Sequence, residues 1–505
     1  MDELAALPGL VHAVWRLARA DALAPREIDP LLPPAPRAMA RTLRLIAGPH
    51  ARAGRPAERL AAALEQLGPV AIKLGQFLST RADIFGEAFA NDLCRLKDQL
   101  APFSLAVARA EIEAALGRPV DGLFSRLEEA VAAASLAQAH PAWLLDGRAV
   151  AVKVLRPGIE QRVAADIAVM ALAARLIEGW SVARRLEPRA FAGIVARALR
   201  LELDLRFEAA GADELRAVMD LDGYMSGPRV VWEGVARRVL TLEWASGVPL
   251  SDPASLTQSG LDRRRLAEGL TRGFLAQALD HGVFHADLHE GNLFAAAPAR
   301  LVVVDFGIIG RLGPAERRYL AEILWGFLQR DYRRLADVHF EAGYVPARHA
   351  PAAFAQALRA VGEPVFGRPA REISMSRLLT QLFEVTALFD MRMRPELVLL
   401  QNPPVTVEGV ARRIDPDFDI WTTAEPVVRR WIARELSPAA RVRALAGDAR
   451  AALDGIARLA ARPATPDPGR PPREAEPRTT AGFGRGFVLG AATVLLAVAL
   501  ALWLR

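Results

Sequence analysis

The sequence predicts an α+β fold with two lobes, a helical extension before them and a membrane-spanning helix after them. Three observations lead to this prediction. The segment Ala149–Leu155 has the composition of a strand in a small, β-rich lobe. Residues 315–460 have mostly helical spacing, which is typical of a second, helical lobe. A run of 18 residues without a charge, 487–504, is long enough to be a bilayer-spanning helix.

Composition narrows the function classes. The 505 residues suffice for two or three domains, and their hydrophobic content of 52% suggests contact with a membrane. The net charge of +6 would suit either nucleic acid or an anionic membrane surface. The basic residues are spread along the chain and match no nucleic-acid-binding fold, so we expect no nucleic-acid partner. Because Cys94 is the single cysteine, an intrachain disulfide and a thiolate metal cage are excluded.

The N-terminal part divides at residue 56. Residues 1–56 mix helical pieces with proline-rich breaks and suggest no function. Residues 57–118 are predicted to be a helical extension, with helices over 57–67 and 70–80 separated by Gly68-Pro69. Lys73 and Gln76 share one face of the second helix. Lys73 lies among apolar residues and should need a carboxylate partner, although a surface lysine with its stem along the helix would fit too.

Residues 119–247 are predicted to form the smaller lobe. Its segment 131–139 occupies the place of a phosphate-binding loop but is rich in alanine rather than glycine, and taken alone it would suit a helix or a core strand. We assign nucleotide contacts to all nine residues: Val131, Ala132, Ala133, Ala134, Ser135, Leu136, Ala137, Gln138 and Ala139. The later segment 240–247 would suit a hinge that contacts adenine, with Glu243 as the candidate residue.

Lysine is rare in this chain, and its positions are informative. Only three of the 64 lysines and arginines are lysines, namely Lys73, Lys97 and Lys153. Lys153 lies in the middle of the apolar segment Ala149–Leu155, where a charge needs a partner. The segment matches the V-A-I-K pattern, whose lysine contacts nucleotide phosphates and pairs with a glutamate on a helix. The sequence therefore predicts that Lys153 takes part in phosphoryl transfer.

An acidic run supplies the expected partners of the lysines. Glu202, Asp204 and Glu208 lie in a predicted helix over 199–215. On one helix, Glu202 and Glu208 would point about 120° apart and could serve different partners. We predict pairs of Glu208 with Lys153 and of Glu202 with Lys73. A solvated acidic face is the alternative.

Residues 248–462 are predicted to form the larger, mostly helical lobe, which contains a polar loop with catalytic character. The loop runs from His285 to Asn292 and is followed by Asp305-Phe306-Gly307. Asp287 would orient or deprotonate the acceptor, whereas Asn292 and Asp305 would hold Mg²⁺ against the phosphates of ATP. The spacing matches the kinase pattern H-R-D-x-x-x-x-N and D-F-G, with Ala286 in place of the arginine. A simple polar turn, or a metal site on His281, His285 and His289, are alternatives.

The C-terminal part predicts a membrane anchor. Residues 463–486 form a linker rich in proline and arginine, followed by the predicted transmembrane helix 487–504. The arginines before this helix would keep the large domain in the cytoplasm. No signal peptide begins the sequence. We therefore expect a bacterial inner-membrane protein with a single C-terminal span and a cytoplasmic catalytic domain.

Four motifs in this order resemble the UbiB/ADCK family of atypical kinase-like proteins, over about residues 57–435. They are Lys73-Leu-Gly-Gln76, the alanine-rich segment 132–135, Glu202-Leu-Asp204 followed by Glu208, and the loop 285–292 with 305–307. The resemblance implies a two-lobed protein-kinase-like fold with Mg²⁺ and ATP between the lobes. It implies catalytic roles for Asp287, Lys153 and Glu208. It also implies that Lys73, Gln76, Glu202 and Asp204 belong to a regulatory, occluding element that obstructs protein substrates.

The resemblance further implies an atypical kinase or ATPase that supports ubiquinone biosynthesis and acts on, or presents, prenylated phenolic or quinone intermediates. Expected partners are anionic membrane lipid, other ubiquinone-biosynthesis proteins and a second copy of the chain. The alternative is a catalytically idle, kinase-like scaffold of a ubiquinone-biosynthesis complex. An older family label, 2-polyprenylphenol 6-hydroxylase, finds no flavin fingerprint and no iron-ligand set in this sequence. Asn402-Pro403-Pro404 should interrupt a helix of the larger lobe.

Overall fold

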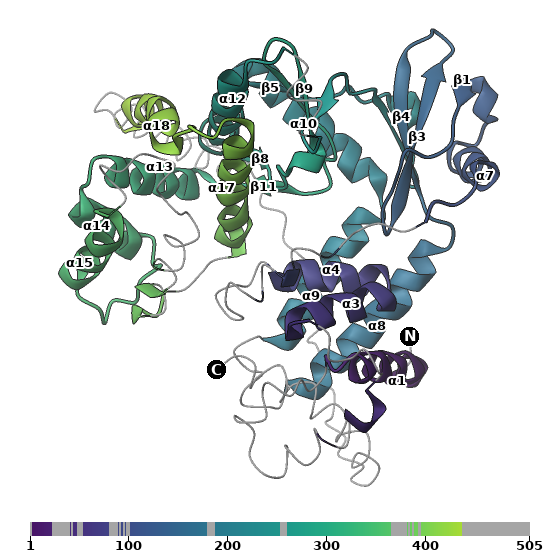
Figure 1. Cartoon of the computed structure of the whole chain (residues 1–505), viewed down its shortest axis with the longest axis horizontal. Helices are drawn as coiled ribbons and strands as arrows, with labels where there is room; N and C mark the ends of the chain where they lie inside the picture. The colour runs from purple at the N-terminus through teal and green to yellow at the C-terminus, as the bar shows by residue number, and fades with distance from the viewer. Residues whose placement is uncertain are drawn as a thin grey trace, which may run out of the picture.

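The computed structural model describes residues 3–22, 44–47, 54–79, 101–178, 187–252, 260–364, 388–391 and 395–436, together with a few isolated residues between these ranges. Within this part of the chain, Figure 1 shows a small lobe built around a sheet, a larger and mainly helical lobe beside it, and a group of helices below the small lobe. The α+β, kinase-like architecture predicted from the sequence is therefore present. We call the small lobe the N-lobe and the larger one the C-lobe.

The N-lobe is built on an antiparallel sheet in the order β1-β3-β4-β6, with β2 paired to β3. Its strands are β1 (Phe124–Leu127), β2 (Ala132–Ala133), β3 (Ala137–Leu144), β4 (Ala149–Leu155) and β6 (Val239–Glu243). In β4, Val150, Val152 and Val154 are fully buried in the core of the lobe. Side chains alternate between the two faces of a strand, so Lys153 points away from that core.

Helices flank this sheet and extend below it. Helix α7 (Leu105–Leu116) begins at the N-cap Ser104 and packs Ile112 into the N-lobe core. The short turns η3 (Val120–Gly122) and η5 (Trp232–Gly234) border β1 and β6. Between β4 and β6 the chain forms three helices, α8 (Ile159–Ile177), α9 (Pro188–Glu202) and α10 (Leu205–Asp222). In Figure 1, α10 lies between the lobes, while α8 and α9 extend downward.

The N-terminal extension packs on α8 and α9. Its described elements are α1 (Glu3–Arg19), η2 (Arg44–Ile46), α3 (Pro56–Leu67) and α4 (Pro69–Ser79). Helix α1 contacts α8 and α3, and α4 contacts α3, α8 and α9. Val70 of α4 enters the same apolar cluster as Val195 and Leu199 of α9. The two helices predicted around Gly68-Pro69 are thus confirmed, and they place Lys73 next to α9.

The C-lobe contains the predicted catalytic loop between short strands. Helix α12 (Arg263–Ala276) continues into the π-helical turn η6 (Gln277–His281), and the turn leads into β8 (Val283–His285). Strand β8 pairs with β11 (Ile309–Arg311), and a second sheet has the order β5-β10-β9-β7. The remaining elements here are β5 (Met225–Ser226), β7 (Val248–Pro249), η7 (Glu290–Asn292), β9 (Leu293–Ala296) and β10 (Arg300–Val303).

Among the described residues, the C-lobe also contains the helices α13 (Pro314–Leu328), α14 (Tyr332–Glu341), α15 (Pro351–Gly362), α17 (Pro395–Ile414) and α18 (Ile420–Glu435). The expected interruption at Asn402-Pro403-Pro404 is wrong, because both prolines lie inside the continuous helix α17. A proline removes one backbone donor from a helix. Here the packing of α17 on α12 outweighs that loss, with Val407, Val410 and Ile414 buried in the main core.

The predicted linker (463–486) and membrane helix (487–504) lie outside the described residues. In the part of the chain that the structure covers, no helix combines the length and the apolar character that crossing a bilayer requires. The expectation of a single C-terminal span that holds the protein at the bacterial inner membrane is therefore not supported.

Candidate nucleotide site

Lys153 is the centre of a three-residue ion cluster between the lobes. Its Nζ lies 2.7 Å and 3.0 Å from the carboxylate oxygens of Glu208 on α10. The same Nζ lies 3.2 Å from Oδ1 of Asp305. Lys153 comes from the N-lobe sheet, whereas Asp305 belongs to the loop after β10 in the C-lobe. The predicted pair of Lys153 with Glu208 is therefore present, and Lys153 also joins the two lobes.

The cluster shifts the pKa values of its members. Burial would lower the pKa of Lys153, but the carboxylates of Asp305 and Glu208 raise it above its usual range. The Lys153 ammonium holds the pKa of Asp305 well below its usual range. Burial raises the pKa of Glu208 to about 6, against the lowering effect of Lys153. Lys153 and Asp305 are therefore charged at neutral pH, and Glu208 is the member that titrates closest to neutrality.

His285 fixes the position of the Asp305 backbone. The backbone N–H of Asp287 donates to Nδ1 of His285 at 3.1 Å, so Nε2 carries the ring proton. Nε2 then donates to the backbone carbonyl of Asp305 at 2.8 Å. Burial lowers the pKa of His285, which keeps the ring neutral in this arrangement. Asp305 itself has a φ of 60°, a left-handed conformation that is costly for a residue with a side chain and that clusters at functional sites.

Asp287 and Asn292 are held together by the loop that separates them. Nδ2 of Asn292 donates to the backbone carbonyl of Asp287 at 3.0 Å, and the backbone carbonyl of Asn292 accepts from Val304 N–H at 2.9 Å. Asn292 is buried, whereas 44% of the Asp287 side chain is exposed. His289 Nε2 lies 3.6 Å from the Asp287 carboxylate. The loop therefore presents the Asp287 carboxylate at the surface on a fixed backbone.

The donor set fits a hard cation such as Mg²⁺. The amide nitrogen of Asn292 is engaged with Asp287, which leaves the amide oxygen as the atom that can bind a cation. The carboxylate of Asp305 is half-exposed and remains ionised. A carboxylate and an amide oxygen, completed by phosphate oxygens and water, are ligands that Mg²⁺ prefers. Asn292 and Asp305 are therefore suited to hold the metal.

The alternative histidine metal site is not formed. His281 pairs with Asp222, His285 bonds to the backbone of Asp287 and Asp305, and His289 lies against Asp287. Across the residues that the structure describes, no group of three or more His, Cys, Asp or Glu side chains could hold a metal ion.

The alanine-rich segment forms the hairpin β2–β3 beside β4. Ala139 pairs with Lys153 across β3 and β4, so the hairpin is adjacent to the lysine. Val131 is exposed, whereas Ser135, Leu136 and Gln138 are buried. Gln138 is bound to both backbone groups of Phe103, with distances of 2.9 Å and 3.0 Å. A nucleotide contact by these buried residues would have to use their backbone.

The predicted hinge lies at the end of β6. The Glu243 backbone N–H donates to Arg229 at 2.9 Å, and its carboxylate lies 3.4 Å from Arg148. Both groups thus have partners within the protein. An adenine contact by Glu243 remains a prediction.

The second predicted pair, Lys73 with Glu202, is also present, at 3.2 Å. The geometric reason that we gave for it is wrong. The single helix expected over 199–215 is broken, because α9 ends at Glu202 and α10 begins at Leu205. Asp204 lies at the break and accepts from Arg206 N–H at 3.2 Å, which caps α10. Gln76 is half-buried one turn beyond Lys73 on α4.

Comparisons with known proteins show the family of this chain. The ABC1 atypical kinase-like domain matches residues 95–339, and the UbiB helical domain matches residues 358–419. A probable protein kinase UbiB from Marinobacter nauticus is 39% identical over 77% of this chain and 72% of its own length. The chain belongs to the UbiB family of atypical kinase-like proteins. A second UbiB relative, from Azotobacter vinelandii, is 38% identical over 94% of this chain and 89% of its own length.

A solved structure supports the fold of this UbiB-family chain. The complex of Rv3197 with erythromycin from Mycobacterium tuberculosis matches 74% of this chain and 95% of its own chain. The TM-score is 0.53 at 23% sequence identity, so the likeness concerns the fold alone.

Two features of this UbiB-family site were missed by the sequence reasoning. His285 was recognised as part of a motif, but nothing in the sequence indicates that its ring joins Asp287 to Asp305. The contact of Lys153 with Asp305 spans 152 residues and was not predicted either. In the kinase pattern, the lysine contacts the phosphates of ATP and the aspartate binds the Mg²⁺ on those phosphates. This common ligand was the signal from which the contact of Lys153 with Asp305 could have been predicted.

Proposed function

We propose that this UbiB-family protein is a Mg²⁺- and ATP-dependent atypical kinase or ATPase. The observation that carries the proposal is the Lys153 ammonium, which bridges Glu208 on α10 and Asp305 beside the loop of Asp287 and Asn292. A lysine held by a helix glutamate next to a metal-binding carboxylate is the arrangement that protein kinases use for phosphoryl transfer. The relatives named probable protein kinase UbiB support the same chemistry.

Each residue has a distinct role in this proposal. Lys153 binds phosphate oxygens, and Glu208 keeps its ammonium in place. Asp287 orients the attacking hydroxyl or water and accepts its proton. Asn292 and Asp305 hold Mg²⁺, which when bound neutralises charge on the phosphates. The backbone of the β2–β3 hairpin covers the nucleotide, and the bond from His285 to Asp305 keeps the metal-binding carboxylate in register with Asp287.

We further propose that the activity serves ubiquinone biosynthesis through prenylated phenolic or quinone intermediates, in contact with anionic lipid and with other proteins of that process. Membership of the UbiB family supports this assignment. The pair of Lys73 with Glu202 supports a small acceptor. It fixes α4 beside the cluster, and Lys73 is near enough to lower the pKa of Asp305. A helix in that position leaves little room for a folded protein substrate.

The test follows the γ-phosphate of labelled ATP with the full-length protein. Mg²⁺ is supplied, with and without a prenylated phenol in phosphatidylcholine vesicles. We expect turnover in the wild type. In Asp305→Asn, which removes a proposed metal ligand, the Mg²⁺ concentration needed for turnover should rise by more than the roughly 10–100-fold that follows from the loss of an outer-shell partner of a metal site. Asp146→Asn is the matched control, because Asp146 pairs only with Arg148 in a surface turn among the contacts described.

The destination of the label separates the possibilities. Label on the phenol identifies a lipid kinase, and label in free phosphate that rises with the phenol identifies a lipid-coupled ATPase. Nucleotide binding without turnover under both conditions would contradict the proposal and would favour a kinase-like scaffold.

A further inference from the structure

The catalytic loop is attached to an unusual turn on its N-terminal side. The π-helical turn η6 ends four residues before His285, the first residue of the loop motif. Oε1 of the buried Gln277 accepts a hydrogen bond from His285 N–H at 3.1 Å. π-helical turns are rare and occur frequently at functional sites. The position of this turn therefore determines where His285, and through its ring Asp287 and Asp305, are placed.

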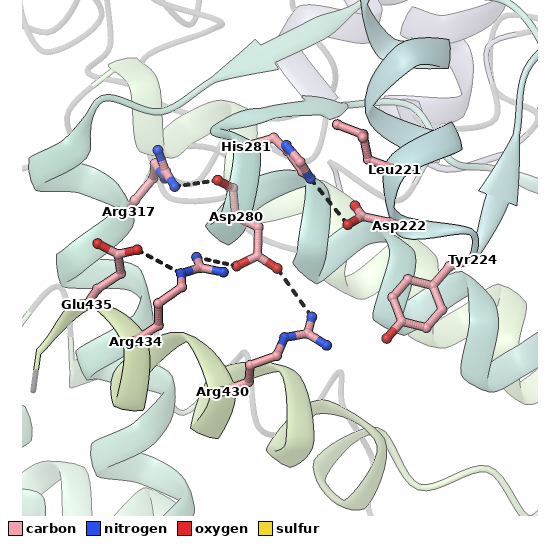
Figure 2. A pocket seen from close by; sticks show the side chains of 9 residues that line it. All are labelled: Leu221, Asp222, Tyr224, Asp280, His281, Arg317, Arg430, Arg434 and Glu435. Carbon is pink, nitrogen blue, oxygen red and sulfur yellow. Dashed lines mark hydrogen bonds and ion pairs between the residues drawn. The ribbon is translucent and has the colours of Figure 1, made fainter. Parts of the chain in front are cut away.

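Helix α18 holds this turn through its side chains. The carboxylate of Asp280 lies 3.3 Å from Arg430 and 2.6 Å from Arg434. Nε1 of Trp431 donates to the carbonyl of Leu279 at 2.8 Å. Figure 2 shows Arg430 and Arg434 pointing from α18 toward Asp280. Three side chains from adjacent turns of α18 thus bind two consecutive residues of η6.

Two further elements meet at the same turn. Arg317 of α13 donates from Nε to the carbonyl of Leu279 at 2.7 Å and from Nη2 to the carbonyl of Asp280. These carbonyls lie at the end of a helix, where backbone acceptors need partners. His281 lies 3.2 Å from Asp222, the last residue of α10, which also carries Glu208. The groups surround a cavity of about 450 Å³ (Figure 2).

Burial makes Asp280 the decisive member of this cluster. Its side chain is only 9% exposed, whereas Arg430 and Arg434 are about half-exposed. Surface ion pairs contribute little to stability, but a buried carboxylate that loses its cations is costly. Moving Asp280 away from the two arginines would therefore cost free energy, so these ion pairs hold η6 against α18.

We propose that Asp280, together with Arg430 and Arg434, positions the catalytic loop for phosphoryl transfer. The three residues act through η6 and His285 and do not themselves bind nucleotide. This inference rests on the proposed function, because its kinetic consequence is a change in ATP turnover. Its structural consequence, the rigidity of the loop, is measurable without turnover.

The test compares Asp280→Asn with the wild type in the full-length protein. Asparagine keeps the shape of the side chain but removes the charge that both arginines bind. We expect faster amide hydrogen exchange in peptides covering residues 283–292, and a kcat for ATP reduced by roughly tenfold to a hundredfold, the cost of a small misplacement of reacting groups. The Kd for Mg²⁺-ATP should change less than the kcat, because Lys153 and Glu208 lie on other elements, whereas Asn292 and Asp305 depend on the position of the loop.

Two more variants keep the test decisive. Arg434→Lys retains a cation near Asp280 and should preserve most of the kcat. Arg429→Gln is the matched control, since Arg429 belongs to α18 but pairs with Glu425 on the same helix. It should leave both the exchange and the kcat unchanged.

The positioning role would be overturned if Asp280→Asn kept the hydrogen exchange and the kcat of the wild type. It would also be overturned if Arg429→Gln lost as much kcat as Asp280→Asn. A third contradicting result is hydrogen exchange in Asp280→Asn that rises equally over the whole C-lobe. The last result would mark Asp280 as a general support of the fold. If the wild type itself has no turnover above an Asp287→Asn variant, the proposed function fails, and the exchange in 283–292 still tests the positioning role.

Discussion

At the scale of single residues, the site depends on how three charges share one small space. Lys153 contacts two carboxylates whose pKa values move in opposite directions. Asp305 is half-exposed and close to two lysines, so it stays ionised. Glu208 is buried on α10, so its ionised form is disfavoured despite its contact with Lys153. Glu208 is therefore the member of this cluster whose charge changes closest to neutral pH.

A pH prediction follows from the raised pKa of Glu208, about 6 compared with its ordinary value of 4.5. Because the folded protein raises this pKa, it favours the neutral form of Glu208. The resulting contribution to the free energy of unfolding is fully present below the ordinary pKa and is lost as the pH rises through about 6. The ionised form is the one that holds Lys153. As the pH falls through about 6, we therefore expect the affinity for Mg²⁺-ATP to decrease. Lys153, Asp305 and Glu202 are the charged groups that shift this titration.

Titration calorimetry from pH 5 to pH 8 measures this affinity. Glu208→Gln should bind Mg²⁺-ATP more weakly than the wild type at pH 8 and should lack the step near pH 6 that the wild type shows. The same step in both proteins would assign the titration to another group.

At the scale of elements, the break between α9 and α10 explains how two glutamates six residues apart reach different lysines. The sequence reasoning obtained the correct pairs from an angle on one continuous helix. In the structure, the two glutamates lie on different helices, because Asp204 adopts an extended conformation and caps α10. A helix-capping aspartate inside an apolar, helix-like pattern is a signal that the sequence contained.

The cap makes a prediction about α10. Asp204→Ala should lower the free energy of unfolding by about 1 kcal/mol, the usual cost of a lost N-cap. It should also weaken Mg²⁺-ATP binding, because the first turn of α10 carries Glu208. Asp331→Ala is the matched control. It removes the N-cap of α14, where Asp331 accepts from Arg334 N–H, and should cost similar stability without changing nucleotide affinity. Urea unfolding and nucleotide titration measure the two effects, and equal affinity losses in both variants would contradict this account.

At the scale of the whole molecule, the sequence predicted the two lobes, and the residues that meet between them, better than it predicted the contacts that hold these parts together. Short motifs with fixed spacing identified Lys153, Asp287, Asn292 and Asp305, because phosphoryl transfer restricts the residue types at those positions. The cluster around Asp280 could not be predicted in this way. Its partners Arg430 and Arg434 lie 150 and 154 residues away. Because 61 of the 64 basic residues in this chain are arginines, the fact that these two partners are arginines does not set them apart in the sequence.

Packing also overrode local preference across the C-lobe. Pro403 and Pro404 predicted an interruption, yet α17 continues through them because its later turns are buried against α12. Tertiary contacts of this kind outweigh the intrinsic cost of an unfavourable residue. The family match over residues 358–419 includes this stretch.

The central claim is that this UbiB-family protein catalyses phosphoryl transfer from ATP with Asp287 as the catalytic carboxylate. The most direct test measures Mg²⁺-dependent ATP turnover and ATP affinity for the wild type and for Asp287→Asn. The account predicts that turnover falls by roughly 10²–10⁴-fold, the usual contribution of a general base. It also predicts nearly unchanged affinity, because Lys153, Asn292 and Asp305 remain. Equal turnover in the two proteins would contradict the claim.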